Sequence, residues 1–239
     1  MISKNQIKYV HQLEMKKYRQ REGLFVAEGP KVVGDLLDAG FKPSQLYSTE
    51  QWQRAGFESN IVTDEELRKV SFLQHPQQVL AVFPIPQRQE ACKPMGLSLA
   101  LDGVQDPGNL GTIIRVADWF GIDTIYCSPD TADAWNPKVV QATMGSIARV
   151  QMIYTDLEQL ISNTSLPVYA TLLDGNDIYQ QELSSEGIIV MGNEGNGISA
   201  PIRQLVSRKL LIPAYRIGAE SLNVAIATAI VCSEFKRRS

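Results

Sequence analysis

Five polar side chains between residues 109 and 223 lie in or beside glycine-containing stretches and could take part in catalysis. In chain order they are Asn109, Arg115, Glu194, Ser221 and Asn223. Glycine lets a backbone turn tightly or lie against a ligand. A guanidinium can be held for contact with an anion or a ribose, and a cation beside a hydroxyl oxygen stabilises it without full deprotonation. These residue types therefore allow chemistry on a hydroxyl or a phosphate, and spacing has to decide which.

Common nucleotide-binding and hydrolase motifs do not fit these stretches. Gly192 and Gly197 have the spacing of a P-loop, but Ile198 stands where that motif needs lysine. The run 108–111 lacks the first glycine of a dinucleotide fingerprint. His11 and His75, the two histidines of the chain, are both in its first half. A Ser-His-Asp hydrolase formed by the second half alone is therefore excluded.

Each stretch also has a purely structural interpretation. The residues from Asp106 to Asn109 could form only a turn and a helix cap, and Ser221 and Asn223 could cap the last helix. Glu194 could cap the turn that follows it. Arg115 is on a mostly apolar helical stretch, so it either extends to solvent along that surface or is held for an anion or a ribose.

Taken in order, the three motifs resemble those of the SpoU (TrmH) family of RNA ribose 2'-O-methyltransferases, within the knotted SPOUT class. The resemblance covers roughly Leu97 to Arg238. The matching residues are Asn109, Gly111, Arg115 and Ala117, then Gly192 to Gly197, then Ser221, Leu222, Asn223 and Val224. Any one motif is weak, but three in the family's order make chance a poor explanation.

The resemblance implies transfer of the S-adenosylmethionine methyl group to a ribose 2'-hydroxyl of structured RNA, rRNA rather than tRNA. It implies five catalytic residues: Asn109, Arg115, Glu194, Ser221 and Asn223. It implies a cofactor pocket formed by Thr171, Leu172, Leu173, Gly192, Asn193, Gly197, Leu211, Ile212, Ser221 and Leu222. The family form differs around Pro213 to Gly218, where methionine usually follows the proline.

The role of arginine needs a physical comment. The family's proposed base is an arginine, yet the guanidinium pKa lies above about 12. We therefore expect Arg115 to stabilise the 2'-oxygen and its neighbouring phosphate, and leave open whether it also acts as the base.

The first part of the chain resembles, more loosely, the family's RNA-binding unit related to ribosomal protein L30e. Between Lys4 and Lys31 the sequence contains seven Lys and Arg residues and three Glu residues. This segment is therefore basic, although the net charge of the chain is −3. A solvated helix face would explain the same pattern. The L30e resemblance is carried by Arg19, Gly23, Glu28 and Gly29. The expected RNA contacts are Lys16 and Lys17 from the basic cluster, Arg19 and Glu28 from this resemblance, and Arg115 from the SpoU motifs.

The apolar pattern predicts an α/β protein with two domains. Short strands over 97–101, 124–127, 150–154, 168–172, 188–191 and 210–212 alternate with helices, as a mostly parallel sheet with helices on both faces requires. A small L30e-like α/β domain is expected over 1–83, a proline-rich linker over 84–96 and the SPOUT domain over 97–239. The deep C-terminal trefoil knot follows from the resemblance alone, since knots are rare.

In the first domain, Ile7, Val10, Met15 and Tyr18 partly fit one helical stripe. Near the other end of the chain, the segment from Val224 to Val231 is apolar almost all round, so it should be buried. Family members pair through this region, and a homodimer is expected.

Composition limits the remaining possibilities. The three cysteines form no CxxC pair, so neither a metal site nor a disulfide framework is expected. No apolar run is long enough to span a membrane, and the start of the chain is not a secretory signal. We expect a cytoplasmic protein that binds no metal and no membrane. The alternatives are a non-catalytic RNA-binding protein that has kept the fold and, less favoured, a nicotinamide-dependent oxidoreductase.

Overall fold

The computed structural model describes residues 2–86, 94–216, 218 and 221–238, and the chain divides into two compact units. One comprises the N-terminal part up to residue 87 together with 133–148. The other comprises the rest of the chain. Most of the predicted linker, 84–96, is outside the described residues.

The first unit is a small α/β layer structure. Its four-stranded sheet has the order β1-β4-β2-β3, in which β4 runs antiparallel to both β1 and β2. Its elements are α1 (Lys4–Gln12), α2 (Lys16–Glu22), β1 (Leu24–Glu28), α3 (Pro30–Asp38), β2 (Gln45–Ser48), β3 (Asn60–Ile61), α4 (Asp64–Val70), β4 (Val79–Pro84), α6 (Pro137–Ala142) and η1 (Ser146–Ala148). Val10, Leu13, Val26, Leu67 and Leu80 are among its buried core residues.

Local sequence signals explain several of these boundaries, and one expectation was wrong. Thr63 and Glu66 form a capping box at the start of α4. The stripe expected from Ile7 to Tyr18 does not lie on one helix, because α1 ends at Gln12 and α2 begins at Lys16. Met15 lies in the break as the N-cap of α2 and is exposed, so it does not extend the apolar face.

The described residues of the second unit form a six-stranded, all-parallel sheet with the order β10-β8-β9-β5-β6-β7. This confirms the predicted fold class and all six predicted strands. Its elements are β5 (Leu97–Asp102), α5 (Pro107–Trp119), β6 (Thr124–Cys127), β7 (Gln151–Tyr154), α7 (Leu157–Ser162), β8 (Val168–Asp177), η2 (Ile178–Gln180), β9 (Gly187–Gly192), α8 (Ala200–Leu205), β10 (Arg208–Leu211) and α9 (Val224–Arg238).

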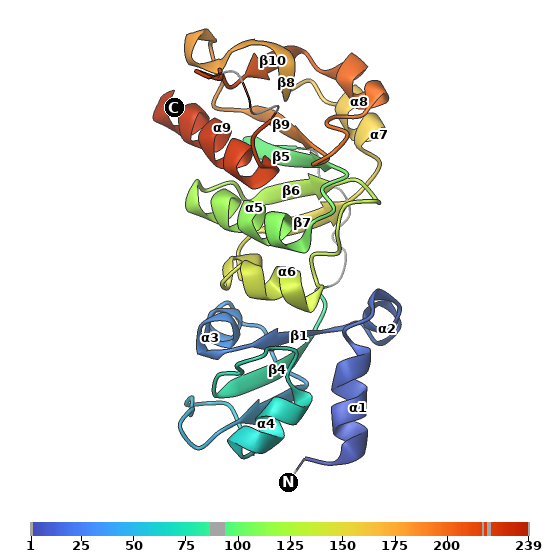
Figure 1. The fold of residues 1–239 in the computed structure, drawn as a ribbon, viewed down its shortest axis with the longest axis vertical. Coiled ribbons are helices and arrows are strands. Elements are labelled where there is room, and N and C mark those ends of the chain that lie inside the picture. The colour runs from blue at the N-terminus through green and yellow to red at the C-terminus, as the bar shows by residue number, and fades with distance from the viewer. Residues whose placement is uncertain (1, 87–93, 217, 219–220, 239) are drawn as a thin grey trace. The chain divides into compact units, whose positions relative to one another are not determined.

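Two helices next to each other cover part of this sheet. Figure 1 shows α5 and α9 side by side, and they pack against each other. α5 begins at Pro107, because Asp106 caps it and Pro107 takes the first helical position, where its missing N–H costs nothing. α9 is only partly buried: Val224, Thr228 and Val231 face the core, whereas Ile226 is 52% exposed.

Strand β8 is longer and less regular than the sequence predicted. Ala170 pairs with Lys209 of β10, but the next residue of β10, Leu210, pairs with Asn176. Residues 171–175 therefore bulge out between the two pairs. Gly175 allows this, because a Cβ atom there would lie 2.5 Å from the backbone of Leu210.

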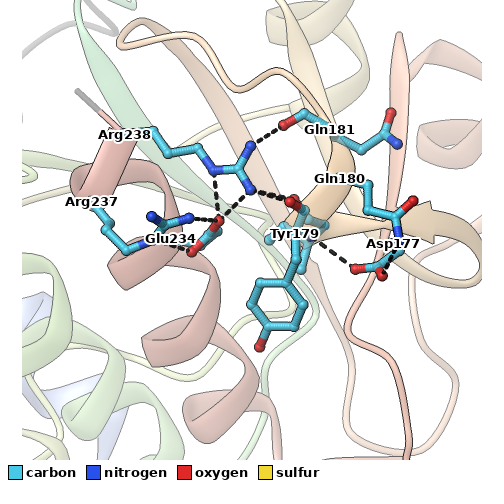
Figure 2. A network of polar contacts seen from close by, with 8 residues as sticks. Asp177, Tyr179, Gln180, Gln181, Glu234, Arg237 and Arg238 are labelled. Atoms are coloured by element: carbon cyan, nitrogen blue, oxygen red, sulfur yellow. Dashed lines mark hydrogen bonds and ion pairs between the residues drawn. The ribbon is translucent and has the colours of Figure 1, made fainter.

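The C-terminal end of α9 is held by a cluster of charged and backbone groups (Figure 2). The Arg238 guanidinium donates to the carbonyls of Ile178, Tyr179 and Gln181, in and just after η2. It also pairs with the buried carboxylate of Glu234, which Arg237 contacts as well. α9 is thus tied at this end to the segment that follows β8.

Candidate active site

The three glycine-rich motifs meet through a chain of side-chain hydrogen bonds. Glu194, just after β9, accepts a bond from Asn109 Nδ2 on α5 at 3.0 Å. Asn109 Oδ1 in turn accepts a bond from Asn223 Nδ2 at 2.9 Å. Glu194 also accepts the backbone N–H groups of Gln105 and Asp106, both at 3.2 Å. The structure therefore brings together Asn109, Glu194 and Asn223, which lie far apart in the sequence.

The direction of each bond in this chain is set by the carboxylate. An ionised carboxylate only accepts, so the Asn109 amide must turn its NH₂ group toward Glu194 and its oxygen toward Asn223. The Asn223 oxygen is then left to accept the N–H groups of Ala225 at 2.9 Å and Ile226 at 3.3 Å. Asn223 thus caps α9 in addition to its bond to Asn109, which confirms the structural interpretation of this residue.

Glu194 lies on a short closed loop whose shape depends on its neighbours. Asn193 and Gly197 exchange two backbone hydrogen bonds, both 2.9 Å. The Asn193 side chain accepts two N–H groups of the same loop and donates to the carbonyl of Gly103 at 2.6 Å. Gly192 is needed for closure, since a Cβ atom there would lie 2.3 Å from the backbone of Gly197. The loop therefore presents Glu194 at a fixed position.

The electrostatics favour an ionised Glu194. Partial burial acts to raise the pKa of its carboxyl group, but the hydrogen bond from Asn109 and the nearby backbone N–H groups outweigh that effect. The net result is a pKa below the ordinary value. Glu194 is therefore a permanent acceptor near neutral pH and is suited to orienting amides, not to donating a proton.

Arg115 lies two turns along α5 from this cluster and differs from it in character. Its side chain is exposed, and no hydrogen bond or ion pair within the described residues holds its guanidinium. A cation that is not neutralised by the protein can bind an anionic or polar ligand. Ser221, two residues before Asn223, is exposed too.

The predicted cofactor residues lie at the carboxyl ends of three neighbouring parallel strands. Thr171 to Leu173 belong to the bulge of β8, Gly192 ends β9, and Leu211 ends β10. Ligands of open parallel sheets bind at this edge. Leu173 and Leu222 are at least half exposed, whereas Thr171, Leu172, Leu211 and Ile212 are half-buried. Exposed apolar side chains beside open loop backbone fit an adenosine group.

Part of the family departure after Pro213 cannot be placed. Ile217, within the predicted stretch Pro213 to Gly218, is outside the described residues, as are 219 and 220.

The predicted RNA contacts of the first unit divide into exposed and buried residues. Lys16 and Lys17 are exposed on α2. Arg19 is only 1% exposed, forms an ion pair with Asp133 at 2.6 Å and donates to the carbonyls of Leu13 and Glu14. The Arg19 guanidinium is bonded within the unit and is not accessible to RNA. The structure therefore corrects the expectation that Arg19 contacts RNA.

Glu28 is also buried, which corrects the same expectation for this residue. It accepts hydrogen bonds from the Ser71 hydroxyl and from the Phe72 N–H at 2.9 Å. Burial raises the pKa of its carboxyl group, and these bonds oppose the rise without cancelling it. Glu28 therefore has a structural position between β1 and the chain after α4.

Sequence reasoning did not identify Asp102, and it named the stretch from Asp106 to Asn109 as a possible helix cap without identifying Asp106 as the capping residue. Asp102 accepts the N–H of Ser199 at 2.7 Å, which ties β5 to the start of α8. Asp106 caps α5 and so places Asn109 in its first turn. Aspartate followed by proline is the signal that could have located this cap.

A parallel sheet with its polar motifs at the carboxyl edge is the arrangement of an α/β enzyme that binds its ligand at that edge. The model of the SpoU rRNA methylase family matches residues 96–233, and that of the MRM3-like substrate binding domain matches residues 4–81. The chain belongs to the SpoU family, and its members use S-adenosylmethionine.

Relatives resemble the whole chain. The chain is 31% identical to the 23S rRNA (guanosine(2553)-2'-O)-methyltransferase RlmP of Bacillus subtilis, over 96% of this chain and 95% of that protein. A structure assigned to the TrmH family of RNA methyltransferases, from Porphyromonas gingivalis, is 42% identical with a TM-score of 0.91, and both chains are covered completely. The AdoMet-bound rRNA methyltransferase of Sinorhizobium meliloti is 32% identical with a TM-score of 0.88, over 99% of this chain and 97% of that one.

The described residues show neither a membrane-spanning helix nor a metal-binding cluster. No helix there is long and apolar enough to cross a membrane. No group of three or more His, Cys, Asp or Glu residues in the same part of the chain is arranged to hold a metal ion.

Proposed function

We propose that this protein methylates a ribose 2'-hydroxyl of ribosomal RNA, with S-adenosylmethionine as methyl donor. The hydrogen-bonded chain from Glu194 through Asn109 to Asn223 carries the proposal, because it joins all three family motifs beside the exposed Arg115. The substrate class comes from relatives whose names specify rRNA.

The donor supplies a methyl group on a positively charged sulfur, which is open to attack by an oxygen nucleophile. The residues of the chain provide orientation, because an in-line displacement gains much of its rate from alignment. Arg115 binds the ribose 2'-oxygen and the adjacent phosphate, where its charge stabilises the oxygen as it becomes nucleophilic. Asn109 and Asn223 are held in one orientation by Glu194, and both side chains border the position of the ribose 2'-oxygen.

The cofactor pocket is proposed at the carboxyl ends of β8, β9 and β10. Leu172, Leu173, Ile212 and Leu222 provide apolar contacts for adenine. Backbone groups of the loops after β9 and β10 provide hydrogen bonds, with Thr171, Gly192, Asn193, Gly197, Leu211 and Ser221 as the remaining proposed members. These loops are also proposed to be knotted, which rests on membership of the SpoU family.

A homodimer through α5 and α9 is part of the proposal. Trp119 on α5 is 85% exposed, and Ile226 on the neighbouring α9 is more than half exposed. Exposed large apolar side chains on adjoining helices are a kind of surface that another protein can cover. A second copy of this chain is the proposed occupant.

The first unit is proposed to supply RNA affinity, and the division into 1–83, 84–96 and 97–239 is kept as a proposal about the order of domains. Lys16 and Lys17 are exposed on α2, so they can reach phosphates. Cytoplasmic location is proposed because ribosomal RNA is assembled and used there.

The competing proposal is a non-catalytic RNA-binding protein of the same fold. Calorimetry with S-adenosylmethionine and with NAD separates the classes, since only the methyltransferase binds the first and releases a methylated RNA. We expect binding of S-adenosylmethionine alone and transfer of its labelled methyl group to rRNA. No binding of either compound, with RNA affinity retained, would favour the non-catalytic alternative.

A further inference from the structure

Helix α2 carries an aromatic ring with two cations placed over it. Lys17 Nζ is 5.0 Å from the centroid of the Tyr18 ring, and Arg21 Cζ is 4.8 Å from the same centroid. These are the two cation–π contacts among the described residues, and both involve the Tyr18 ring. Such contacts can be simple helix packing, so the surroundings of the guanidinium have to decide whether it also serves a ligand.

The helix is oriented by its buried side. Arg19 points inward to Asp133 and to the carbonyls of Leu13 and Glu14. Arg21 lies three residues from Tyr18, the spacing at which helical side chains contact each other. The Arg21 side chain remains 63% exposed. The buried Arg19 therefore fixes a helix whose outer side presents Tyr18 and Arg21 together.

The guanidinium of Arg21 is held along one edge. Its Nε and one terminal nitrogen both contact Glu22 Oε1, at 2.8 and 2.7 Å. This is an edge through which arginine would bind a phosphate with two bonds. With this edge occupied by a carboxylate and the guanidinium carbon 4.8 Å over the Tyr18 ring, the surface left for a ligand is mainly the side of the group that is turned away from the ring.

A flat, exposed guanidinium backed by an aromatic ring matches the way proteins bind unpaired bases of RNA. Bases that are not stacked in a helix pack on aromatic rings and on arginine planes. The group needs little ordering on binding, since Tyr18 and Glu22 already restrict it, and preorganisation favours affinity. Neighbouring Lys16 and Lys17 supply charge for the adjoining phosphates.

We propose that Arg21, supported by Tyr18, is a stacking site for one unpaired nucleobase of the RNA substrate. The proposal rests on the proposed function and adds a recognition mode to it. A site of this kind selects single-stranded or bulged RNA, because bases inside a duplex are already stacked and cannot reach it.

The test compares a dodecamer of uridylate, carrying one central 2-aminopurine, with an RNA duplex of the same length. Arg21→Lys keeps the charge and removes the plane. Lys16→Gln is the matched control on the same helix, because it removes a charge and keeps the plane. We expect Arg21→Lys to weaken single-strand binding about tenfold and duplex binding less than twofold. The quenching of 2-aminopurine on binding should be lost in Arg21→Lys and retained in Lys16→Gln.

Equal effects of Arg21→Lys on the two RNAs, or no effect on either, would overturn the stacking site. So would quenching that persists in this variant. The proposed function is judged separately by methyl transfer from the wild-type protein to rRNA, so the two can fail independently. Thermal unfolding of each variant checks that the exposed substitutions leave the fold intact.

Discussion

Glu194 accepts a hydrogen bond from the Asn109 side chain at 3.0 Å, although 85 positions separate the two residues. The bond links the loop after β9 to the first turn of α5, and through Asn223 it reaches the start of α9. One carboxylate thus sets the orientation of two amides. Glu194 is therefore a positioning residue for the other polar groups of the site.

We expect Glu194→Gln to disturb this arrangement and make it insensitive to acid. Glutamine would place an NH₂ group against a backbone or amide donor, at a cost of about 1 kcal/mol in the free energy of unfolding. The folded pKa of Glu194 is lowered, so its contribution is complete above the ordinary carboxyl pKa of about 4.3. That contribution is lost as the pH falls through the folded pKa.

Urea unfolding at neutral pH and near pH 4 measures both effects. The stability difference between wild type and Glu194→Gln should shrink at the lower pH. A difference that grows on acidification would contradict the assignment of Glu194 as an ionised acceptor.

Arg115→Ala separates a catalytic contact from a surface residue. If Arg115 faces the 2'-oxygen, loss of its donor should cost on the order of 3 kcal/mol, or about a hundredfold in single-turnover methyl transfer. Affinity for S-adenosylmethionine should be unchanged, because that pocket is proposed at other strand ends. Lysine should restore little activity, since it lacks the planar fork. Near-normal turnover in the alanine variant would remove Arg115 from the active site.

The cluster in Figure 2 predicts unequal effects for two adjacent arginines. Arg238 binds three backbone carbonyls in addition to Glu234. Among the described residues, Arg237 contacts Glu234 and no backbone carbonyl. We expect Arg238→Ala to lower the free energy of unfolding by about 2 kcal/mol, and Arg237→Ala, the matched control, by less than about 1 kcal/mol. Equal losses would mean that the carbonyl contacts add no stability.

The same cluster should weaken in acid. Hydrogen bonding to Arg237, followed by that to Arg238, lowers the pKa of Glu234 to about 2 against the burial that raises it. The contribution of Glu234 to stability is thus complete above the ordinary carboxyl pKa. It declines as the pH falls from there toward the folded pKa of about 2.

The exposed Trp119 offers a test of the dimer. Trp119→Glu should give the monomer mass in light scattering at micromolar concentration, because a buried charge opposes association. Leu205→Glu, at a partly exposed apolar residue on α8, is the control and should leave the dimer intact. A wild-type protein that is already monomeric would contradict the proposed interface.

The sequence predicted elements better than it predicted long-range partners. Short apolar runs located all six strands of the parallel sheet, most clearly β5, β6 and β9, which are buried along nearly their whole length. The bulge of β8 was missed, since it depends on where Leu210 pairs with the neighbouring strand. No local pattern contains that information.

The buried Arg19 shows the same limit in the first unit. Its partner Asp133 lies 114 residues later, and Trp135 packs its ring 4.6 Å from that of Phe25. The proline-rich stretch 84–96 gave no sign that residues 133–148 would join the N-terminal unit. A protein truncated at 84–96 would lose residues 133–148 from the N-terminal unit and leave Arg19 and Phe25 without their partners. Point substitutions are therefore the better test of RNA binding.

The measurement that tests the central claim most directly is a map of ribose methylation in rRNA from cells that lack the gene. We expect one 2'-O-methyl group to be lost, to return with the wild-type gene, and to stay absent with the Arg115→Ala gene at equal protein level. An rRNA methylation pattern that is unchanged by deletion of the gene would contradict the account.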